Sequence, residues 1–229
     1  MKNSINYLLI LFVSVFASCS KSDDSNLPDD DNGGPFSSSY WPLAVGNTWN
    51  LANMDNSQEK STYLLHKSLQ HEGKTYYQFK PVGTDLDVEL KDGIREDNGI
   101  FYELHGATSA MGVNTSAGVI TSINLNLAVG AIWKDEVTLN ISGLASGTIK
   151  HNNEGKILAK SASESINGKT YKDVIKVETK KTVRNSVSGY TFTIIYENWL
   201  AKGVGIIYEK TTYGANDFER FGLVSYSLK

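Results

Sequence analysis

The sequence has few of the features that cross-link a fold or mark a familiar chemistry. Cys19 is its only cysteine, which excludes an intramolecular disulfide. After Pro42 the chain has one further proline, and its formal net charge of −3 provides no basic footprint for nucleic acid. No segment of ten or more residues repeats its apolar residues at the 3.6-residue period of an amphipathic helix. Little helix is therefore expected.

Motifs for metal or nucleotide chemistry are missing as well. The four histidines form no zinc-ligand spacing, and no Gly-x-Ser-x-Gly elbow occurs. Gly203-Val204-Gly205 is followed by β-branched residues, which argues against a nucleotide loop and favours a strand entry where the backbone approaches another group closely. Asp29-Asp30-Asp31 lacks the alternating ligands of a calcium loop. No catalytic residue, metal or cofactor is predicted, and the chain is not expected to be an enzyme.

The first residues have the pattern of an export signal. Lys2 supplies a positive charge, and the apolar run from Tyr7 to Ala17 is too short to span a bilayer as a stable helix. Phe16-Ala17-Ser18-Cys19 then resembles the lipobox of bacterial lipoproteins, with Phe16 where that family usually has Leu. The resemblance implies a signal peptide over residues 1–18 and a diacylated Cys19 that holds the protein on a membrane. An ordinary secretory cysteine is the alternative.

Residues 19–39 are predicted to form a flexible acidic tether, because so few of them are apolar that burial cannot offset their ordering entropy. The start of this segment, Ser20-Lys21-Ser22-Asp23-Asp24, is similar to the acidic export signal of Bacteroidota surface lipoproteins. That similarity implies a cell-envelope address on the outer membrane, facing either the periplasm or the surface. A single folded domain is expected over residues 40–229.

Three short blocks recur in the same order within that domain. The matched blocks are 43–49 (LAVGNTW) with 127–133 (LAVGAIW), 73–76 with 168–171, and 99–103 with 205–209. Ordered recurrence predicts a duplicated β unit, with repeats over residues 43–126 and 127–229. The longer second repeat would carry an insertion around Asn152–Gly155. One larger sheet that uses similar turns twice is the alternative.

Alternating apolar and polar residues predict strands over most of the domain. Thr62–Leu69 and Tyr171–Val183 place their apolar side chains on one face, as half-buried strands do. Asp97-Asn98-Gly99 predicts a tight hairpin because both turn residues tolerate positive φ, whereas Gly106–Ser122 is interpreted as a long loop. About a dozen strands would twist too strongly to stay flat. The predicted fold is all-β: an antiparallel, strongly curved sheet, as a half-barrel or a sandwich, built from two similar halves.

The two ends of the domain carry a family resemblance. An opening with aromatic-Pro-Leu and Gly-Asn-x-Trp, here residues 40–49, and a closing Trp199-Leu-Ala-Lys-Gly-Val-Gly205 resemble a family of Bacteroidota surface or periplasmic lipoproteins. The resemblance covers most of the folded chain and implies no reaction. Half-barrel lipoprotein carriers have a similar general fold and bind lipid, which is an analogy at the level of the fold alone.

Two sets of residues are candidates for a functional site. The tryptophans of the repeated blocks are expected in the core, whereas Trp41 lies outside those blocks and is the speculative ligand-binding residue. Asp85, Asp87 and Glu89 alternate onto one face of a strand, where a glycosidase-like carboxylate pair is conceivable. A solvated strand face is the simpler interpretation of these acids.

The leading functional hypothesis is a membrane-anchored, non-enzymatic β domain that binds a glycan, lipid or protein partner at the cell envelope. One alternative is a carrier that holds lipid or another hydrophobic ligand in an apolar concavity. The other is a glycoside hydrolase-like enzyme that uses the acidic strand face. The sequence leaves open whether the concave side of the sheet is filled or hollow.

Overall fold

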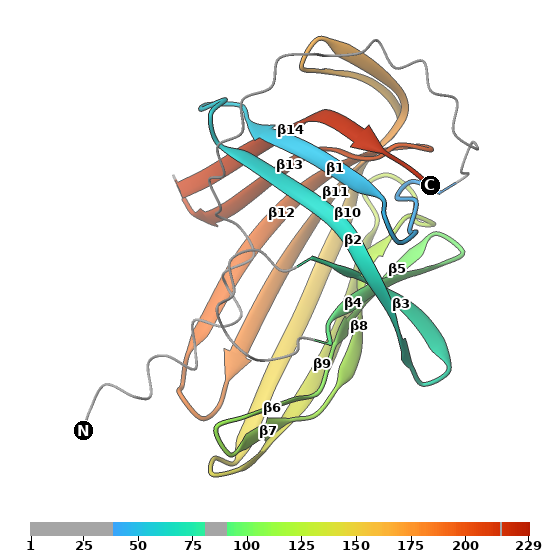
Figure 1. Cartoon of the computed structure of the whole chain (residues 1–229). Helices are drawn as coiled ribbons and strands as arrows, with labels where there is room; N and C mark the ends of the chain where they lie inside the picture. Colours follow the sequence, from blue (N-terminus) through green and yellow to red (C-terminus); the bar gives the residue numbers. More distant parts are fainter. Residues whose placement is uncertain (1–38, 81–90, 216) are drawn as a thin grey trace.

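A computed structural model of the chain (Figure 1) describes residues 39–80, 91–215 and 217–229. These residues form fourteen strands and no helix, which confirms the all-β prediction. In chain order the strands are β1 (Thr48–Asn53), β2 (Lys60–His71), β3 (Lys74–Phe79), β4 (Gly93–Asp97), β5 (Ile100–His105), β6 (Thr108–Ala110), β7 (Val113–Thr115), β8 (Gly118–Asn124), β9 (Ile132–Gly143), β10 (Gly147–Ile166), β11 (Lys169–Asn185), β12 (Thr191–Ala201), β13 (Gly205–Gly214) and β14 (Asp217–Ser227).

The strands belong to one antiparallel sheet in the order β6-β7-β9-β10-β11-β12-β13-β14-β1-β2-β3-β4-β5-β8. Figure 1 shows how this sheet curls, so that the short strand β8 lies against the long strands β9 and β10. The two edge strands, β6 and β8, are not paired with each other. The predicted strongly curved antiparallel sheet is confirmed. Because the described residues hold no helix, none of them forms a long apolar helix that could cross a bilayer.

Side-chain alternation along the long strands divides the interior into two apolar clusters separated by polar residues. The main cluster includes Trp133, Ile157 and Val177, and a smaller one is built around Leu139 and Ile149. Between them, the inward positions of the same three strands are polar. We call these residues the polar belt: Asp135, His151, Asn153, Thr179 and Lys181. Apolar side chains therefore fill the concave side of the sheet on both sides of the polar belt.

Strand β8 crosses this polar belt and is held there by side chains of the opposite wall. The Asp135 carboxylate accepts a hydrogen bond from the backbone N–H of Thr121 at 2.7 Å, and the Asn153 amide donates to the carbonyl oxygen of Thr121 at 3.0 Å. An edge strand has unpaired backbone groups that cost free energy when they are buried without partners. The belt supplies some of those partners, which explains why polar residues occupy inward positions here.

The repeated Leu-Ala-Val-Gly block folds into the same turn twice. Gly46 and Gly130 both have positive φ, and their N–H groups donate to the carbonyl oxygens of Leu65 in β2 and Ile157 in β10, at 2.7 and 2.8 Å. The tryptophan that closes each block is buried, with Trp49 at 0% and Trp133 at 7% exposure. This confirms the predicted core positions of the two tryptophans. Duplication of the whole unit stays a prediction.

One local prediction is wrong, one is confirmed and one is not tested. Gly106–Ser122 is not a loop, because β6, β7 and part of β8 form there; small residues hid the alternation. Asn152–Gly155, where the second repeat is expected to carry an insertion, lies in the middle of the twenty-residue strand β10, and the insertion stays a prediction. Asn98 and Gly99 do form the tight β4–β5 turn, both with positive φ.

Candidate functional site

Trp41, predicted as a ligand-stacking residue, lies in the core and not on the surface. Its side chain is 8% exposed, and its ring centroid is 5.6 Å from that of Phe79, 6.2 Å from Phe101 and 6.3 Å from Trp49. Trp41 is buried because the chain that enters the domain folds its first tryptophan onto the aromatic core. A ligand role for Trp41 is not tested by these contacts and stays a prediction.

Two other sets of predicted residues fall outside the described part of the chain. Cys19, the predicted lipidation site, precedes the first described residue. Asp85, Asp87 and Glu89, the acidic strand face, fall in the undescribed range 81–90. Among the described residues, no group of three His, Cys, Asp or Glu side chains is arranged to hold a metal ion.

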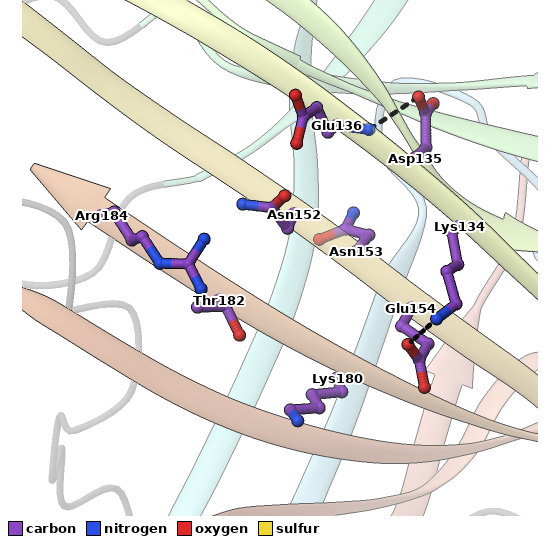
Figure 2. A pocket seen from close by; sticks show the side chains of 9 residues that line it. All are labelled: Lys134, Asp135, Glu136, Asn152, Asn153, Glu154, Lys180, Thr182 and Arg184. Atoms are coloured by element: carbon purple, nitrogen blue, oxygen red, sulfur yellow. Dashed lines mark hydrogen bonds and ion pairs between the residues drawn. The ribbon is translucent and has the colours of Figure 1, made fainter.

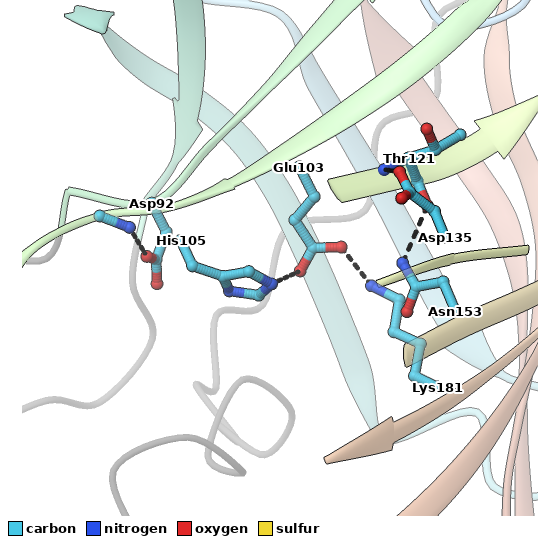
Figure 3. A network of polar contacts seen from close by, with 8 residues as sticks. Asp92, Glu103, His105, Thr121, Asp135, Asn153 and Lys181 are labelled. Atoms are coloured by element: carbon cyan, nitrogen blue, oxygen red, sulfur yellow. Dashed lines mark hydrogen bonds and ion pairs between the residues drawn. The ribbon is translucent and has the colours of Figure 1, made fainter. Parts of the chain in front are cut away.

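An ionic network occupies the interior where β5 meets the polar belt (Figure 3). Lys181 of β11 forms an ion pair and a hydrogen bond with Glu103 of β5. The Nε2 atom of His105 lies 3.8 Å from the other oxygen of the same carboxylate. The ring of His105 stacks on that of His151, with their centroids 4.0 Å apart. The network therefore joins two walls of the curved sheet that are far apart in sequence.

The charges of this network determine which of its groups ionise. Desolvation disfavours ionised Glu103, but the Lys181 ammonium and His105 outweigh it and lower the pKa of Glu103 to about 2. Burial, followed by the neighbouring His105, lowers the pKa of His151 to about 3. Near neutral pH, Glu103 is therefore a carboxylate paired with Lys181, and His151 is neutral.

A second interior carboxyl, Glu209 of β13, is in the opposite state. It is 7% exposed, and both of its oxygens lie 3.0 to 3.1 Å from the hydroxyl of Tyr63, which donates to them. Burial raises the pKa of Glu209 to about 7, although the Tyr63 hydrogen bond and the charge of Lys181 act against that rise. Glu209 therefore titrates near neutral pH. Carboxyls with divergent pKa values are typical of acid–base catalysis, but Glu209 is buried and already has a partner.

A different site lies on the outer face of the sheet, over β9, β10 and β11. The side chains there form a shallow hollow of about 600 Å³, shown in Figure 2. Strand register arranges the outward residues in three cross-strand rows of β9, β10 and β11 residues. The rows are Thr138-Lys150-Arg184, Glu136-Asn152-Thr182 and Lys134-Glu154-Lys180. We call this surface the outer hollow.

The outer hollow has more cations than its carboxylates can pair. Lys134 bonds Glu154 at 2.7 Å, and Lys150 bonds Glu136 at 2.7 Å. Lys180 and Arg184 have no ion pair of their own within the described part of the chain.

Register also places Arg184 directly opposite Lys150, and like charges in that position are destabilising. The side-chain nitrogen of Asn152, in the middle row, is buried without a hydrogen-bond partner. The surface is therefore ready to accept negative charge.

An open antiparallel sheet curled over its own filled interior defines the fold, and solved structures with a similar fold exist. One is a protein described as a lipoprotein from Parabacteroides distasonis, with 14% identity, coverage of 82% of this chain and 98% of the other, and a TM-score of 0.47. Another is an exported protein with a YmcC-like fold from Bacteroides fragilis, with 9% identity, 84% and 99% coverage, and a TM-score of 0.44. The lipoprotein YmcC from Escherichia coli has 9% identity, 81% and 87% coverage, and a TM-score of 0.31.

These descriptions name an export route or an anchor, and none of them names a ligand or a reaction. No family model matches the chain, and no curated protein matches its sequence.

The sequence did contain signals for both parts of the site. Glu103 and Glu209 are the last residues of the third pair of matched blocks, 99–103 and 205–209. The repeat therefore singled out both interior carboxyls, but it gave no sign of the residues that contact them. The alternation predicted for Tyr171–Val183 turns Lys180 away from the apolar face of its strand, and Lys180 does lie in the outer hollow. The hollow itself depends on the register of three strands, which the sequence does not contain.

Proposed function

We propose that this chain is a cell-envelope lipoprotein, anchored by lipid on Cys19, whose β domain is a non-enzymatic module that binds an anionic ligand in the outer hollow. The signal-like residues 1–18, the acidic segment 19–39 and the domain over 40–229 are then an export address, a tether and a binding body. The lipobox-like start supports the anchor. The outer membrane, on its periplasmic or surface side, is the proposed location.

The observation that carries the binding proposal is the unpaired positive charge of the outer hollow. Four cations face two carboxylates in its three rows, in a chain whose formal net charge is −3. An anionic ligand would relieve the repulsion between Lys150 and Arg184, and the planar guanidinium of Arg184 suits a carboxylate, sulfate or phosphate group. Acidic glycans of the envelope carry such groups.

The interior gives the other two hypotheses little support. A lipid carrier needs an apolar concavity, and the described concave face is packed with buried residues such as Leu65, Phe101 and Ile157, each at 0% exposure. The hydrolase hypothesis rests on Asp85, Asp87 and Glu89, which lie outside the described residues. The interior carboxyl Glu209 offers no substitute, because it is buried against Tyr63. Neither the carrier nor the hydrolase is therefore part of the proposal.

Fractionation of cells that express the full chain tests the anchor. The wild-type protein is expected in the membrane fraction with acyl groups on Cys19, detected by mass spectrometry. Cys19→Ala should leave the protein without acyl groups and without membrane retention. Retention of that variant, or a wild-type Cys19 without acyl groups, would count against the anchor.

Calorimetric titration with matched neutral and carboxylated or sulfated oligosaccharides tests the hollow. The acidic members of the panel are expected to bind, and Arg184→Ala should weaken that binding about tenfold, the effect of losing one charge-assisted contact. Lys160→Ala removes an exposed charge from the same strand as Lys150, outside the hollow, and should leave the affinity unchanged. Equal binding of neutral and acidic sugars, or equal losses in both variants, would reject the hollow as the site.

A further inference from the structure

Three neighbouring hairpin turns expose large apolar side chains at one end of the molecule. We call these residues the apolar tips: Met111 of the β6–β7 turn, Leu144 of the β9–β10 turn, and Val187 and Tyr190 of the β11–β12 turn. Met111 is 86% exposed, Leu144 84%, Val187 48% and Tyr190 45%. Figure 1 shows the β6–β7 and β9–β10 turns together at the lower end of the molecule, with the β11–β12 turn beside them.

Direct contacts hold the three turns next to one another. The backbone N–H of Leu144 donates to the carbonyl oxygen of Gly112 at 2.9 Å, which joins the first turn to the second. The N–H of Ser186 donates to the carbonyl oxygen of Thr148 at 2.9 Å, which joins the third turn to β10. The apolar tips are therefore one structural unit.

The charge pattern around the apolar tips differs from that of other hairpin turns in the chain. The segments 110–113, 143–147 and 185–190 contain no charged residue. Other described turns do, for example His71-Glu72-Gly73-Lys74 and the turn that ends at Lys169. Moving inward from the apolar tips along β10 and β11, the first charges are Lys150 and Arg184, both cations. Exposed apolar side chains with cations close behind them are typical of a surface that lies on an anionic bilayer.

We propose that the apolar tips insert into the interface of the membrane that holds the lipid anchor. This inference rests on the anchoring at Cys19 proposed above. A protein partner fits the surface less well, because a stable protein interface buries about 800 Å² on each side and draws on about 20 to 30 residues. The apolar tips present four large apolar side chains. For a bilayer, a few inserted side chains are enough once a tether keeps them close.

The length of the chain before the domain allows this orientation. The carbonyl oxygen of Ser39 accepts a hydrogen bond from the N–H of Gly203, which places the entry of the chain at the end of β12 that is distant from Tyr190. An eleven-residue strand is about 36 Å long. The twenty residues from Cys19 to Ser38 can extend to about 70 Å. The tether can therefore reach along the whole domain and leave the apolar tips on the bilayer.

The test uses the chain from Ser20 onward with an N-terminal hexahistidine tag, captured on vesicles of phosphatidylethanolamine, phosphatidylglycerol and a nickel-chelating lipid. This capture supplies a membrane tether whether or not Cys19 is acylated in cells. Because Cys19 is the only natural cysteine, Leu144→Cys provides a unique thiol for an environment-sensitive fluorophore. Lys172→Cys, an exposed position near the other end of β11, is the matched control.

The label at residue 144 is expected to shift to shorter wavelength and to be quenched several-fold more strongly by nitroxides on the acyl chains than the label at residue 172. Introducing Met111→Ser and Val187→Ser into the Leu144→Cys chain should reduce that quenching several-fold. Equal responses at the two positions would overturn the proposal, as would a shift at residue 144 that needs no lipid and grows with protein concentration, because it would indicate self-association. Insertion of the tethered tips together with a natural Cys19 that carries no lipid would reject the proposed anchor and support insertion. A lipidated Cys19 with tips that do not insert would reject insertion and leave the proposed anchor in place.

Discussion

Glu103 and Glu209 end two similar pentapeptides, Gly99–Glu103 in the β4–β5 hairpin and Gly205–Glu209 in β13, and both carboxyls contact groups of the interior. Their surroundings differ. Glu103 pairs with the ammonium of Lys181, whereas the hydrogen-bond partner of Glu209 among the described residues is the hydroxyl of Tyr63. Burial opposes ionisation at both positions, but a full positive charge reverses its effect at Glu103 and a hydroxyl does not at Glu209.

The two Leu-Ala-Val-Gly turns differ from this pair of carboxyls, because the two turns have similar surroundings. Each turn places its tryptophan against a glycine of another strand: a β carbon on Gly205 would lie 2.5 Å from the Trp49 ring, and one on Gly155 would lie 1.9 Å from the Trp133 ring. Matched sequence thus corresponds to matched backbone. The chemistry at matched positions depends on residues supplied from elsewhere in the fold.

Truncation of the two tryptophans should produce the largest effects and shows how closely the two turns correspond. We expect Trp49→Ala to cost about 5 kcal/mol and Trp133→Ala about 4 kcal/mol. The difference of about 1 kcal/mol is the hydrogen bond that Trp49 Nε1 donates to the carbonyl oxygen of Val204, because Trp133 Nε1 has no partner. Urea unfolding followed by circular dichroism measures both changes, and Trp→Phe variants retain the comparison if alanine prevents folding. A larger loss at Trp133 would contradict it.

Removing the Lys181 cation from Glu103 should show how much its charge contributes to the difference between Glu103 and Glu209. Lys181→Met leaves Glu103 among uncharged and weakly basic groups, and we expect a loss of about 3 kcal/mol in the free energy of unfolding at pH 7. A carboxyl whose pKa falls from 4.5 to about 2 on folding contributes stability that is present above about pH 4.5 and lost as the pH falls toward about 2. The difference between wild type and Lys181→Met should therefore shrink over that range.

The neighbouring residue provides the control for this experiment. Lys180→Met changes an outward-facing lysine and should cost little at any pH. Similar losses for the two lysines would mean that the ion pair with Glu103 has no special weight.

The contribution of Glu209 to the free energy of unfolding should have the opposite pH dependence to that of Glu103. The pKa of Glu209 rises from 4.5 to about 7 on folding, so between those values the folded state holds a proton that the unfolded state has released. Stability from this group is complete below about pH 4.5 and is lost as the pH rises through about 7. Glu209→Gln removes this dependence and should gain about 2 kcal/mol relative to wild type between pH 4.5 and pH 8.

Unfolding of both proteins across this pH range measures the gain. Glu178→Gln, which changes an exposed carboxyl of β11, should follow the wild-type curve. A Glu209→Gln curve parallel to that of the wild type would show that Glu209 is ionised in the folded protein throughout.

Local patterns in the sequence predicted the backbone well and the site poorly, for a physical reason. Alternation, positive-φ turn residues and the repeated Trp-ending blocks act over a few residues, and they correctly predicted strands, the turn at Asn98-Gly99 and two buried tryptophans. The outer hollow and the pairing of Glu103 with Lys181 depend on strand register across the sheet and between walls of the fold. Small residues concealed β6 and β7 because glycine, serine and alanine carry little apolar alternation.

The smallest predicted effect concerns Tyr63, the one hydrogen-bond partner of Glu209 among the described residues. Tyr63→Phe deletes a hydroxyl that donates to both carboxyl oxygens, and we expect a loss of about 1 kcal/mol at pH 8. The loss should be smaller at pH 5, because a hydrogen bond to an ionised carboxylate is stronger than one to the protonated acid. For the same reason the pKa of Glu209 should rise further, which NMR titration of the carboxyl carbon measures.

Tyr226→Phe, which changes a more exposed tyrosine of β14, is the control and should alter neither quantity. If Tyr63→Phe lowered the pKa of Glu209 or cost more at pH 5 than at pH 8, the hydroxyl could not be acting as a donor to the carboxylate. In that case, Tyr63 would not stabilise the ionised form of Glu209, and the contrast with Glu103, which Lys181 stabilises, would need another explanation.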